Sequence, residues 1–142
     1  MTYVFDACAL IAFLDGEEGK DAVKDILKQA IDEKETLVYI SAVNLVEVYY
    51  GYIRDLGREK ALVILEKIYA VPVKIIETAT KPVYLEASRL KATYKMALGD
   101  AIGLATAINL NGVFVTSDGE LAEPEAREHA PIFWFRPPKP KK

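Results

Sequence analysis

The chain has very little cysteine and histidine. Its 142 residues contain one of each, Cys8 and His129. A single cysteine cannot form an intramolecular disulfide. A nucleophilic thiolate needs a basic partner, and no histidine lies near Cys8 in the sequence. The sequence therefore excludes a disulfide scaffold and argues against cysteine catalysis, and we assign His129 no role.

Long hydrophobic runs are also missing. The longest uncharged stretch, residues 101–117, contains Asn109, Asn111 and Gly112, so it predicts a helix, a turn and a strand and not a membrane span. The first residues lack a basic start, and Asp6 interrupts the apolar stretch that a signal peptide needs. We therefore expect a cytoplasmic protein that has no membrane partner.

The chain has no excess of positive charge and no glycine loop for phosphates. Its 18 Lys and Arg against 21 Asp and Glu give a net charge of −3, so a polyanion must meet a local basic patch. Arg54 with Arg58, and Lys91 with Lys95, are candidates, although lysines on amphipathic helices usually serve only solvation. The G-x-G-x-x-G and G-x-x-x-x-G-K-[ST] loops of dinucleotide and nucleoside-triphosphate sites are absent.

Short apolar segments alternate with helical patterns along the chain. Segments rich in β-branched or aromatic residues predict parallel strands at residues 3–5, 37–40, 73–76, 113–115 and 132–135. Between them, apolar residues recur at helical spacing, as in Val23, Ile26, Leu27, Ala30 and Ile31.

This alternation predicts the domain organisation. Strands that alternate with helices favour an α/β fold, here a three-layer α/β/α sandwich with a central, mainly parallel sheet. We place one domain at residues 1–136. The end of the chain, RPPKPKK, predicts a solvated segment, and we expect residues 137–142 to form a mobile tail.

Four of the 21 acidic residues differ from the rest in context. Most lie in charged, solvent-facing segments such as DGEEGKD and EPEARE. Asp6 and Asp118 follow predicted strands, whereas Glu47 and Asp100 lie in the apolar helical segments SAVNLVEVYYG and GDAIGLATA. Ligands of an open parallel sheet bind beyond the carboxyl ends of its strands, which is where Asp6 and Asp118 fall.

Each of these acids also has a purely structural explanation. The three aspartates stand where helices can begin, and an aspartate at the N-cap contributes about 1 kcal/mol. Glu47 can point outward or pair with Arg54. Taken singly, capping explains the aspartates better than chemistry does.

Together, the four acids require positive charge. Two carboxylates ~4 Å apart repel by about 4 kcal/mol at an effective dielectric constant of 20, more than a cap contributes. Protonation of one acid or a bound cation relieves this repulsion. Oxygen ligands without His or Cys suit Mg²⁺ or Mn²⁺ and disfavour zinc. Such an ion activates a water and neutralises charge on a phosphodiester, so the cluster indicates metal-assisted hydrolysis.

Four motifs together resemble the PIN-domain ribonucleases, and within them the VapC-type toxins of toxin–antitoxin pairs. The motifs are YVFDACALIAFL, ISAVNLVEVYYG, LGDAIGLATA and VFVTSD, and in this order they span nearly the whole chain. The resemblance implies a PIN-like fold and a metal-dependent endoribonuclease that uses Mg²⁺ or Mn²⁺. It implies that Asp6, Glu47, Asp100 and Asp118 are the catalytic, metal-binding acids.

The resemblance also implies supporting residues and partners. Thr116 and Ser117 are candidates to hydrogen-bond the acids, and Cys8 stands where family members usually carry Ser or Thr. RNA is the implied substrate. A cognate antitoxin is the implied partner, with an arginine that reaches the acids in place of a metal. The family and the tyrosines of EVYYGY predict a homodimer with at least one of these rings exposed.

Other functions compete with this interpretation. A haloacid dehalogenase-type phosphotransferase also has an aspartate after its first strand, but it needs a second acid where this chain has Cys8. A non-catalytic PIN-like scaffold that binds RNA or protein gains nothing from four clustered acids. A structure-specific DNA nuclease would use the same metal chemistry. The scaffold and the DNA nuclease stay open as alternatives.

Overall fold

Five parallel strands form a central sheet in the computed structural model, which describes residues 1–139. The strand order is β3-β2-β1-β4-β5, and each neighbouring pair runs parallel. The strands are β1 (Thr2–Phe5), β2 (Leu37–Ser41), β3 (Lys74–Ile76), β4 (Val113–Asp118) and β5 (Ile132–Lys139). The predicted parallel sheet is confirmed.

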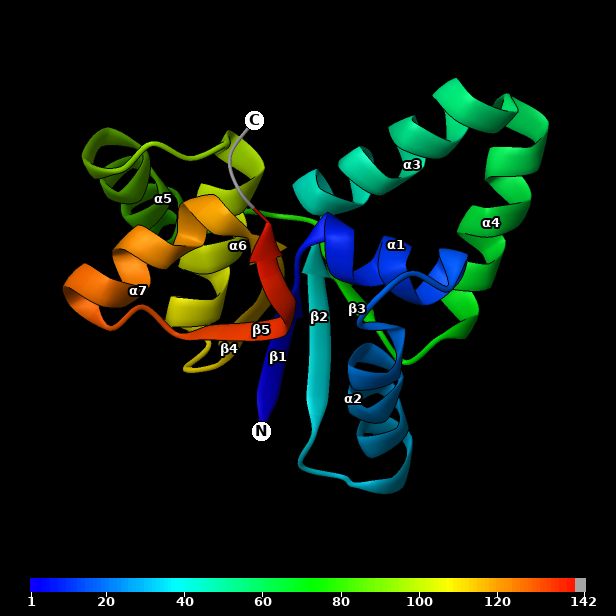
Figure 1. Cartoon of the computed structure of the whole chain (residues 1–142), viewed down its shortest axis with the longest axis horizontal. Helices are drawn as coiled ribbons and strands as arrows, with labels where there is room; N and C mark the ends of the chain where they lie inside the picture. Colours follow the sequence, from blue (N-terminus) through cyan, green and yellow to red (C-terminus); the bar gives the residue numbers. More distant parts are fainter. Residues whose placement is uncertain (140–142) are drawn as a thin grey trace.

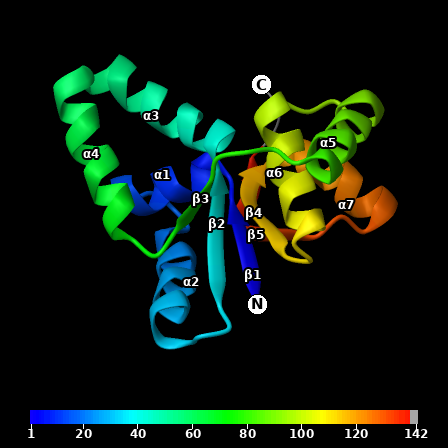
Figure 2. The ribbon, with the colours of Figure 1, turned by 180° about the vertical axis from the view of Figure 1, so that it is seen from behind.

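Helices cover both faces of this sheet. They are α1 (Ala7–Asp15), α2 (Lys20–Asp32), α3 (Ala42–Leu56), α4 (Arg58–Ala70), α5 (Lys81–Thr93), α6 (Leu98–Asn109) and α7 (Ala122–Glu128), with a 3₁₀ turn η1 (Gly119–Leu121) before α7. Helices α1 to α4 lie on one side, and α5 to α7 lie on the other (Figures 1 and 2). The predicted three-layer α/β/α sandwich is therefore confirmed. Within residues 1–139, no helix has the length and apolar character needed to cross a membrane.

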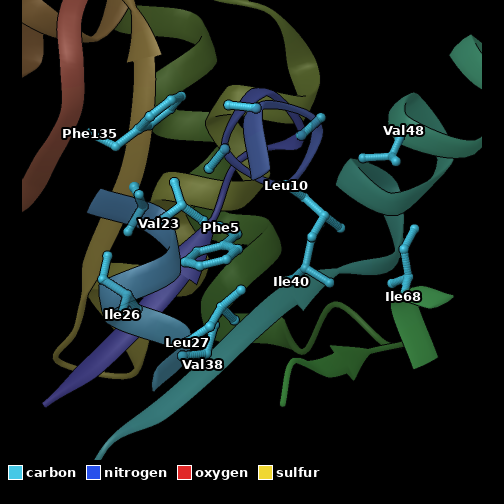
Figure 3. Close-up of a cluster of buried hydrophobic side chains, with 14 of the residues drawn as sticks. Phe5, Leu10, Val23, Ile26, Leu27, Val38, Ile40, Val48, Ile68 and Phe135 are labelled. Atoms are coloured by element: carbon cyan, nitrogen blue, oxygen red, sulfur yellow. The ribbon is translucent and has the colours of Figure 1, made fainter. Parts of the chain in front are cut away.

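Two hydrophobic cores lie between the layers, one on each face of the sheet. Neighbouring residues of β1 point to opposite faces, so Phe5 belongs to the first core and Val4 to the second. The first core packs Phe5 against Leu10 of α1 and Ile26 of α2 (Figure 3). The second packs Val4 against Leu104 of α6. Burial on both faces explains why the strands appear in the sequence as continuous apolar runs.

The strand order determines where a ligand can bind. The chain passes from β1 to β2 and β3 on one side, whereas β4 and β5 lie on the other, so the topological switch point is between β1 and β4. Crevices for ligands form beyond the carboxyl ends of the strands at such a point. Asp6 follows β1 directly and Asp118 ends β4. Helices α1 and α3 begin at the same edge of the sheet (Figure 1).

Two details of the sequence prediction are wrong. Ile31 continues the apolar pattern of α2, but it is 71% exposed because it lies in the last turn of that helix. Arg136 was assigned to the solvated end of the chain, but it is buried, because β5 continues beyond residue 135 and pairs with β4 as far as Lys139. The rest of the predicted mobile tail, residues 140–142, lies outside the described residues.

One substitution made at two positions of α2 tests this packing. Ile26→Ala removes a side chain that is 2% exposed, so we expect the free energy of unfolding to fall by about 2–5 kcal/mol. Ile31→Ala removes an exposed side chain and should change it by less than about 0.5 kcal/mol. Urea denaturation followed by circular dichroism measures both values. Equal losses would contradict the packing of α2.

Candidate metal centre

Asp6 is a buried carboxylate at the junction of β1 and α1. Its backbone is extended and its side chain caps α1, with Oδ1 accepting a hydrogen bond from the Ala7 N–H at 2.7 Å. Oδ2 accepts hydrogen bonds from Thr116 Oγ1 at 2.7 Å and from Cys8 Sγ at 3.4 Å. The predicted cap is thus present, and two further donors hold the carboxylate. Thr116 and Cys8, two of the candidate supporting residues, both donate to the Asp6 carboxylate.

Asp100 projects from the first turn of α6 and is 4% exposed. The capping explanation is wrong for this residue, because the N-cap of α6 is Ala97 and Asp100 lies three residues further on. Its carboxylate lies against those of Asp6 and Asp118. Burial raises the pKa of Asp100 far above its usual value, and the negative charges of its two neighbours raise it further. Asp100 therefore needs a proton or a cation.

Glu47 reaches the same edge from the second turn of α3. Its Oε1 lies so close to Gly99 that a Cβ on this glycine would overlap it, which brings Glu47 to the start of α6. Burial raises its pKa to about 7, and the charges of Asp6 and Asp118 contribute. The alternative explanation, a pairing of Glu47 with Arg54, is not found among the described residues, where Arg54 contacts Asp55 at 3.0 Å.

Asp118 ends β4 and brings a fifth acid into the site. Its Oδ1 accepts a hydrogen bond from the Glu120 N–H at 3.0 Å, which caps the turn η1. One carboxylate oxygen from each of Asp100, Asp118 and Glu120 lies within 4.8 Å of the others. The sequence analysis missed Glu120. The available signal was its spacing of two residues from Asp118 in SDGEL, directly after a strand.

Asn44 is a second residue that the sequence analysis missed. It is fully buried, and its Oδ1 accepts a hydrogen bond from Ser41 Oγ at 2.7 Å. Its Nδ2 donates to the Gly99 carbonyl at 3.2 Å, which ties the start of α3 to the start of α6. Asn44 and Glu47 are three residues apart on one face of α3. The hydrogen bond from Asn44 to Gly99 therefore places Glu47 beside Asp100.

The donor set of this centre fits a hard divalent cation. The candidate ligands offer only carboxylate oxygens, which Mg²⁺ and Mn²⁺ prefer. They are Asp6, Glu47, Asp100, Asp118 and Glu120. Burial and the charge of Asp6 raise the pKa of Cys8, so its thiol stays protonated and is a poor metal ligand. Asp100 and Asp118 share one group of carboxylates with Glu120, Asp6 and Glu47 lie near enough for charges to act between them and this group, and the roles of these acids as metal ligands stay a prediction.

The raised pKa values predict how the metal-free protein responds to pH. Acids with a raised pKa keep protons in the folded state that the unfolded chain releases, so the contribution of Glu47 and Asp100 to stability is greatest at low pH and falls as pH rises. In EDTA, we expect the thermal midpoint to fall between pH 5 and pH 8. Asp100→Asn removes one charge and should flatten this dependence. Circular dichroism melts measure both slopes, and equal slopes would contradict the electrostatic coupling.

Comparisons with known proteins agree with this architecture. The family model of the PIN domain matches residues 3–126. The structure of VapBC2 from Rickettsia felis with promoter DNA aligns with a TM-score of 0.74 at 17% identity, over 94% of this chain and 98% of that chain. VapBC-1 from nontypeable Haemophilus influenzae aligns with a TM-score of 0.71 at 16% identity, over 95% and 98%. VapC20 from Mycobacterium tuberculosis, a sarcin-ricin loop cleaving toxin, aligns with a TM-score of 0.64 at 16% identity, over 85% and 93%.

No curated protein matches the chain by sequence. At the identities above, the solved structures establish the likeness of the fold alone. The family model spans most of the chain and covers all five acids of the candidate centre. The chain therefore belongs to the PIN domain family.

Proposed function

We propose that this protein is a metal-dependent endoribonuclease and the toxin of a VapBC-type toxin–antitoxin pair. The observation that carries the proposal is the convergence of acids from separate elements at the switch point of the sheet. Asp6 and Asp100 are each only 4% exposed, and the described residues place no Lys or Arg side chain in contact with either carboxylate. A bound cation at this place supplies the charge that the protein lacks.

The side chains divide into groups that hold a cation and groups that act on the substrate. Asp6, Asp100 and Asp118 are the proposed ligands, and Glu120 extends the set on the side of η1. Glu47 approaches from α3, a different element from those of the other acids, and it either joins the ligands or holds the attacking water. When bound, a hard divalent ion activates water and neutralises charge on the phosphodiester oxygens. Thr116 keeps Asp6 oriented through its 2.7 Å hydrogen bond.

The proposed substrate is single-stranded or loop RNA. VapC20, which shares this fold, is a toxin that cleaves the sarcin-ricin loop. Unstacked phosphodiesters in loops can approach a small site at a sheet edge, whereas the backbone of a duplex is held away from it. A DNA nuclease and a non-catalytic scaffold are the alternatives that the activity measurements below distinguish.

The proposed partners are a cognate antitoxin and a second copy of the chain. The solved structures from R. felis and H. influenzae are VapBC complexes. Helix α3 carries an exposed apolar stripe of Val43, Val46 and Tyr50 at spacings of three and four residues. The expected exposed tyrosine is Tyr50, which is 55% exposed and has the Arg54 guanidinium over its ring. Contiguous exposed apolar side chains of this kind favour a protein interface.

Two charge-neutralising substitutions test the activity. Asp6→Asn and Asp100→Asn keep size and shape but remove one negative charge each, and we expect a folded protein whose cleavage rate falls at least a hundredfold, about 3 kcal/mol. The measurement is cleavage of single-stranded RNA, duplex RNA and single-stranded DNA with Mg²⁺, Mn²⁺ or EDTA.

The matched control is Asp32→Asn, an exposed acid at the end of α2, which should leave the rate unchanged. Circular dichroism shows whether each variant is folded. Full activity in folded Asp6→Asn, or cleavage that persists in EDTA, would overturn the metal mechanism. Cleavage of DNA alone would favour the DNA nuclease, and no cleavage by the wild type would favour the scaffold.

The apolar stripe of α3 makes a prediction about assembly. Sedimentation at micromolar concentration should show a homodimer, and Val46→Glu should weaken it at least tenfold, because a charge then enters the interface. Ile31→Glu changes an exposed isoleucine of α2 in the same way and should leave the dimer intact. A monomeric wild type, or a dimer unaffected by Val46→Glu, would contradict the proposed interface.

A further inference from the structure

A chain of hydrogen bonds leads from the C-terminal strand to Asp6. Arg136 Nε donates to Ser117 Oγ at 3.1 Å, Ser117 Oγ donates to Cys8 Sγ at 3.7 Å, and Cys8 Sγ donates to Asp6 Oδ2 at 3.4 Å. A guanidinium group can only donate, so the Ser117 oxygen must accept from it. A carboxylate can only accept, so the single thiol hydrogen of Cys8 goes to Asp6, and the single Ser117 hydroxyl hydrogen goes to Cys8. Arg136 and Asp6 together therefore fix the direction of the chain from its two ends, and Arg136 holds the Ser117 hydroxyl in place.

Arg136 lies in a buried site, where several contacts fix its side chain. Among the Lys and Arg side chains that the structure describes, it alone is buried. Its Nη1 contacts Glu17 Oε1 at 3.3 Å and the Glu18 carbonyl at 3.0 Å, and its guanidinium lies over the Phe135 ring. Gly19 has a φ of +88° and no room for a Cβ, which would meet Phe135 and Arg136. The turn between α1 and α2 thus encloses the guanidinium.

An irregularity of the sheet aims Arg136 at Ser117. Thr116 of β4 pairs with Trp134 of β5, but Asp118 pairs with Lys139, so extra residues of β5 bulge out opposite Ser117. Pro137 and Pro138 lie in this bulge and cannot donate to a strand ladder. Bulges redirect side chains at the edges of sheets, and here Arg136 turns into the protein.

A simpler explanation is that Arg136 only fastens β5 to the turn between α1 and α2. The contacts with Glu17 and Glu18 satisfy that explanation, but Nε is directed at Ser117 instead. Without Arg136, the Ser117 hydroxyl loses the contact that orients it and can turn to accept from the Cys8 thiol, and Asp6 then loses one of its donors. The two explanations therefore differ in what happens to Asp6 when Arg136 is lost. If Arg136 only fastens β5, the hydrogen bonds of Asp6 stay unchanged.

We propose that Arg136 is a positioning residue of the metal centre, which acts on Asp6 through Ser117 and Cys8. The proposal rests on the metal-binding function above. Arg136 contacts neither substrate nor metal. It keeps the Cys8 thiol pointed at Asp6 Oδ2, so that Asp6 presents its remaining lone pairs to the cation in one orientation. Partners of metal ligands typically change metal affinity by ten- to a hundredfold.

The first experiment measures Mn²⁺ binding by the electron paramagnetic resonance of the free ion, with the full-length chain. We expect Arg136→Met and Ser117→Ala each to weaken binding about tenfold, and Arg136→Lys, which still can only donate, to recover most of it. Glu17→Gln is the matched control, because it removes the ion pair and leaves the chain of donors intact. It should lower stability without changing Mn²⁺ affinity.

A double-mutant cycle shows whether Arg136 and Cys8 affect Mn²⁺ binding through one chain of hydrogen bonds or independently. If Arg136 acts through Cys8, the variant that combines Arg136→Met with Cys8→Ala binds Mn²⁺ no more weakly than the worse single variant. If the fold-losses of Mn²⁺ affinity in the two single variants multiply in the double variant, the proposal is overturned. Unchanged Mn²⁺ affinity in Arg136→Met would overturn it as well. If Arg136→Met does not fold, Arg136→Gln takes its place in the same cycle, and Ser117→Ala with Cys8→Ala tests only the link between those two residues.

The second experiment does not depend on metal. Cys8 is the only cysteine of the chain, so its S–H stretching band in the infrared spectrum can be assigned without ambiguity. Donation to Asp6 should shift this band to lower frequency relative to the unfolded chain, and Ser117→Ala should reduce the shift. An unchanged band would overturn the chain of donors. A wild type with the shifted band but no Mn²⁺ binding would overturn the proposed metal function and leave the hydrogen-bond direction established.

Discussion

Repulsion between buried carboxylates is the constraint on which the rest of this structure depends. Asp6 and Asp100 are almost completely excluded from water, and Asp118 and Glu47 add their charges to the same edge. Desolvation raises the pKa of Asp6, Asp100 and Glu47, and for Asp100 and Glu47 the charges of neighbouring acids raise the pKa further. A protein that only needed stability would place apolar or hydrogen-bonded groups here. The free-energy cost of burying these like charges is relieved if a cation binds among them, as proposed above.

The acids are held in different ways, which suits different tasks. Asp6 accepts hydrogen bonds from Ala7, Thr116 and Cys8, so its position is determined by the protein itself. Asp100 has carboxylates as its neighbours, so its charge state depends on what binds. If a cation binds here as proposed, Asp6 offers it a carboxylate whose position is already fixed, and Asp100 one whose repulsion the cation relieves.

The position of the acids follows from the topology of the sheet and from close approach of two helices. β1 and β4 are neighbours, although more than a hundred residues separate Asp6 from Asp118, and their carboxyl ends meet at the switch point. Asn44 and Gly99 bring α3 against α6, one by a hydrogen bond and the other by having no side chain. These contacts deliver Glu47 to the other acids from a different element.

The sequence by itself determined the alternation of strands and helices and singled out four acids, because strand and helix periodicities and apolar context are local properties. It also indicated oxygen ligands, since His and Cys are almost absent. Glu120, Asn44 and Arg136 needed the tertiary structure. Glu120 enters the centre through a 3₁₀ turn, Asn44 through a contact between helices, and Arg136 through a bulge that reverses the exposure expected of a charged residue near prolines. The placements of Asn44 and Arg136 depend on contacts between distant segments, which no local pattern encodes, whereas for Glu120 only the close approach to Asp100 required the fold.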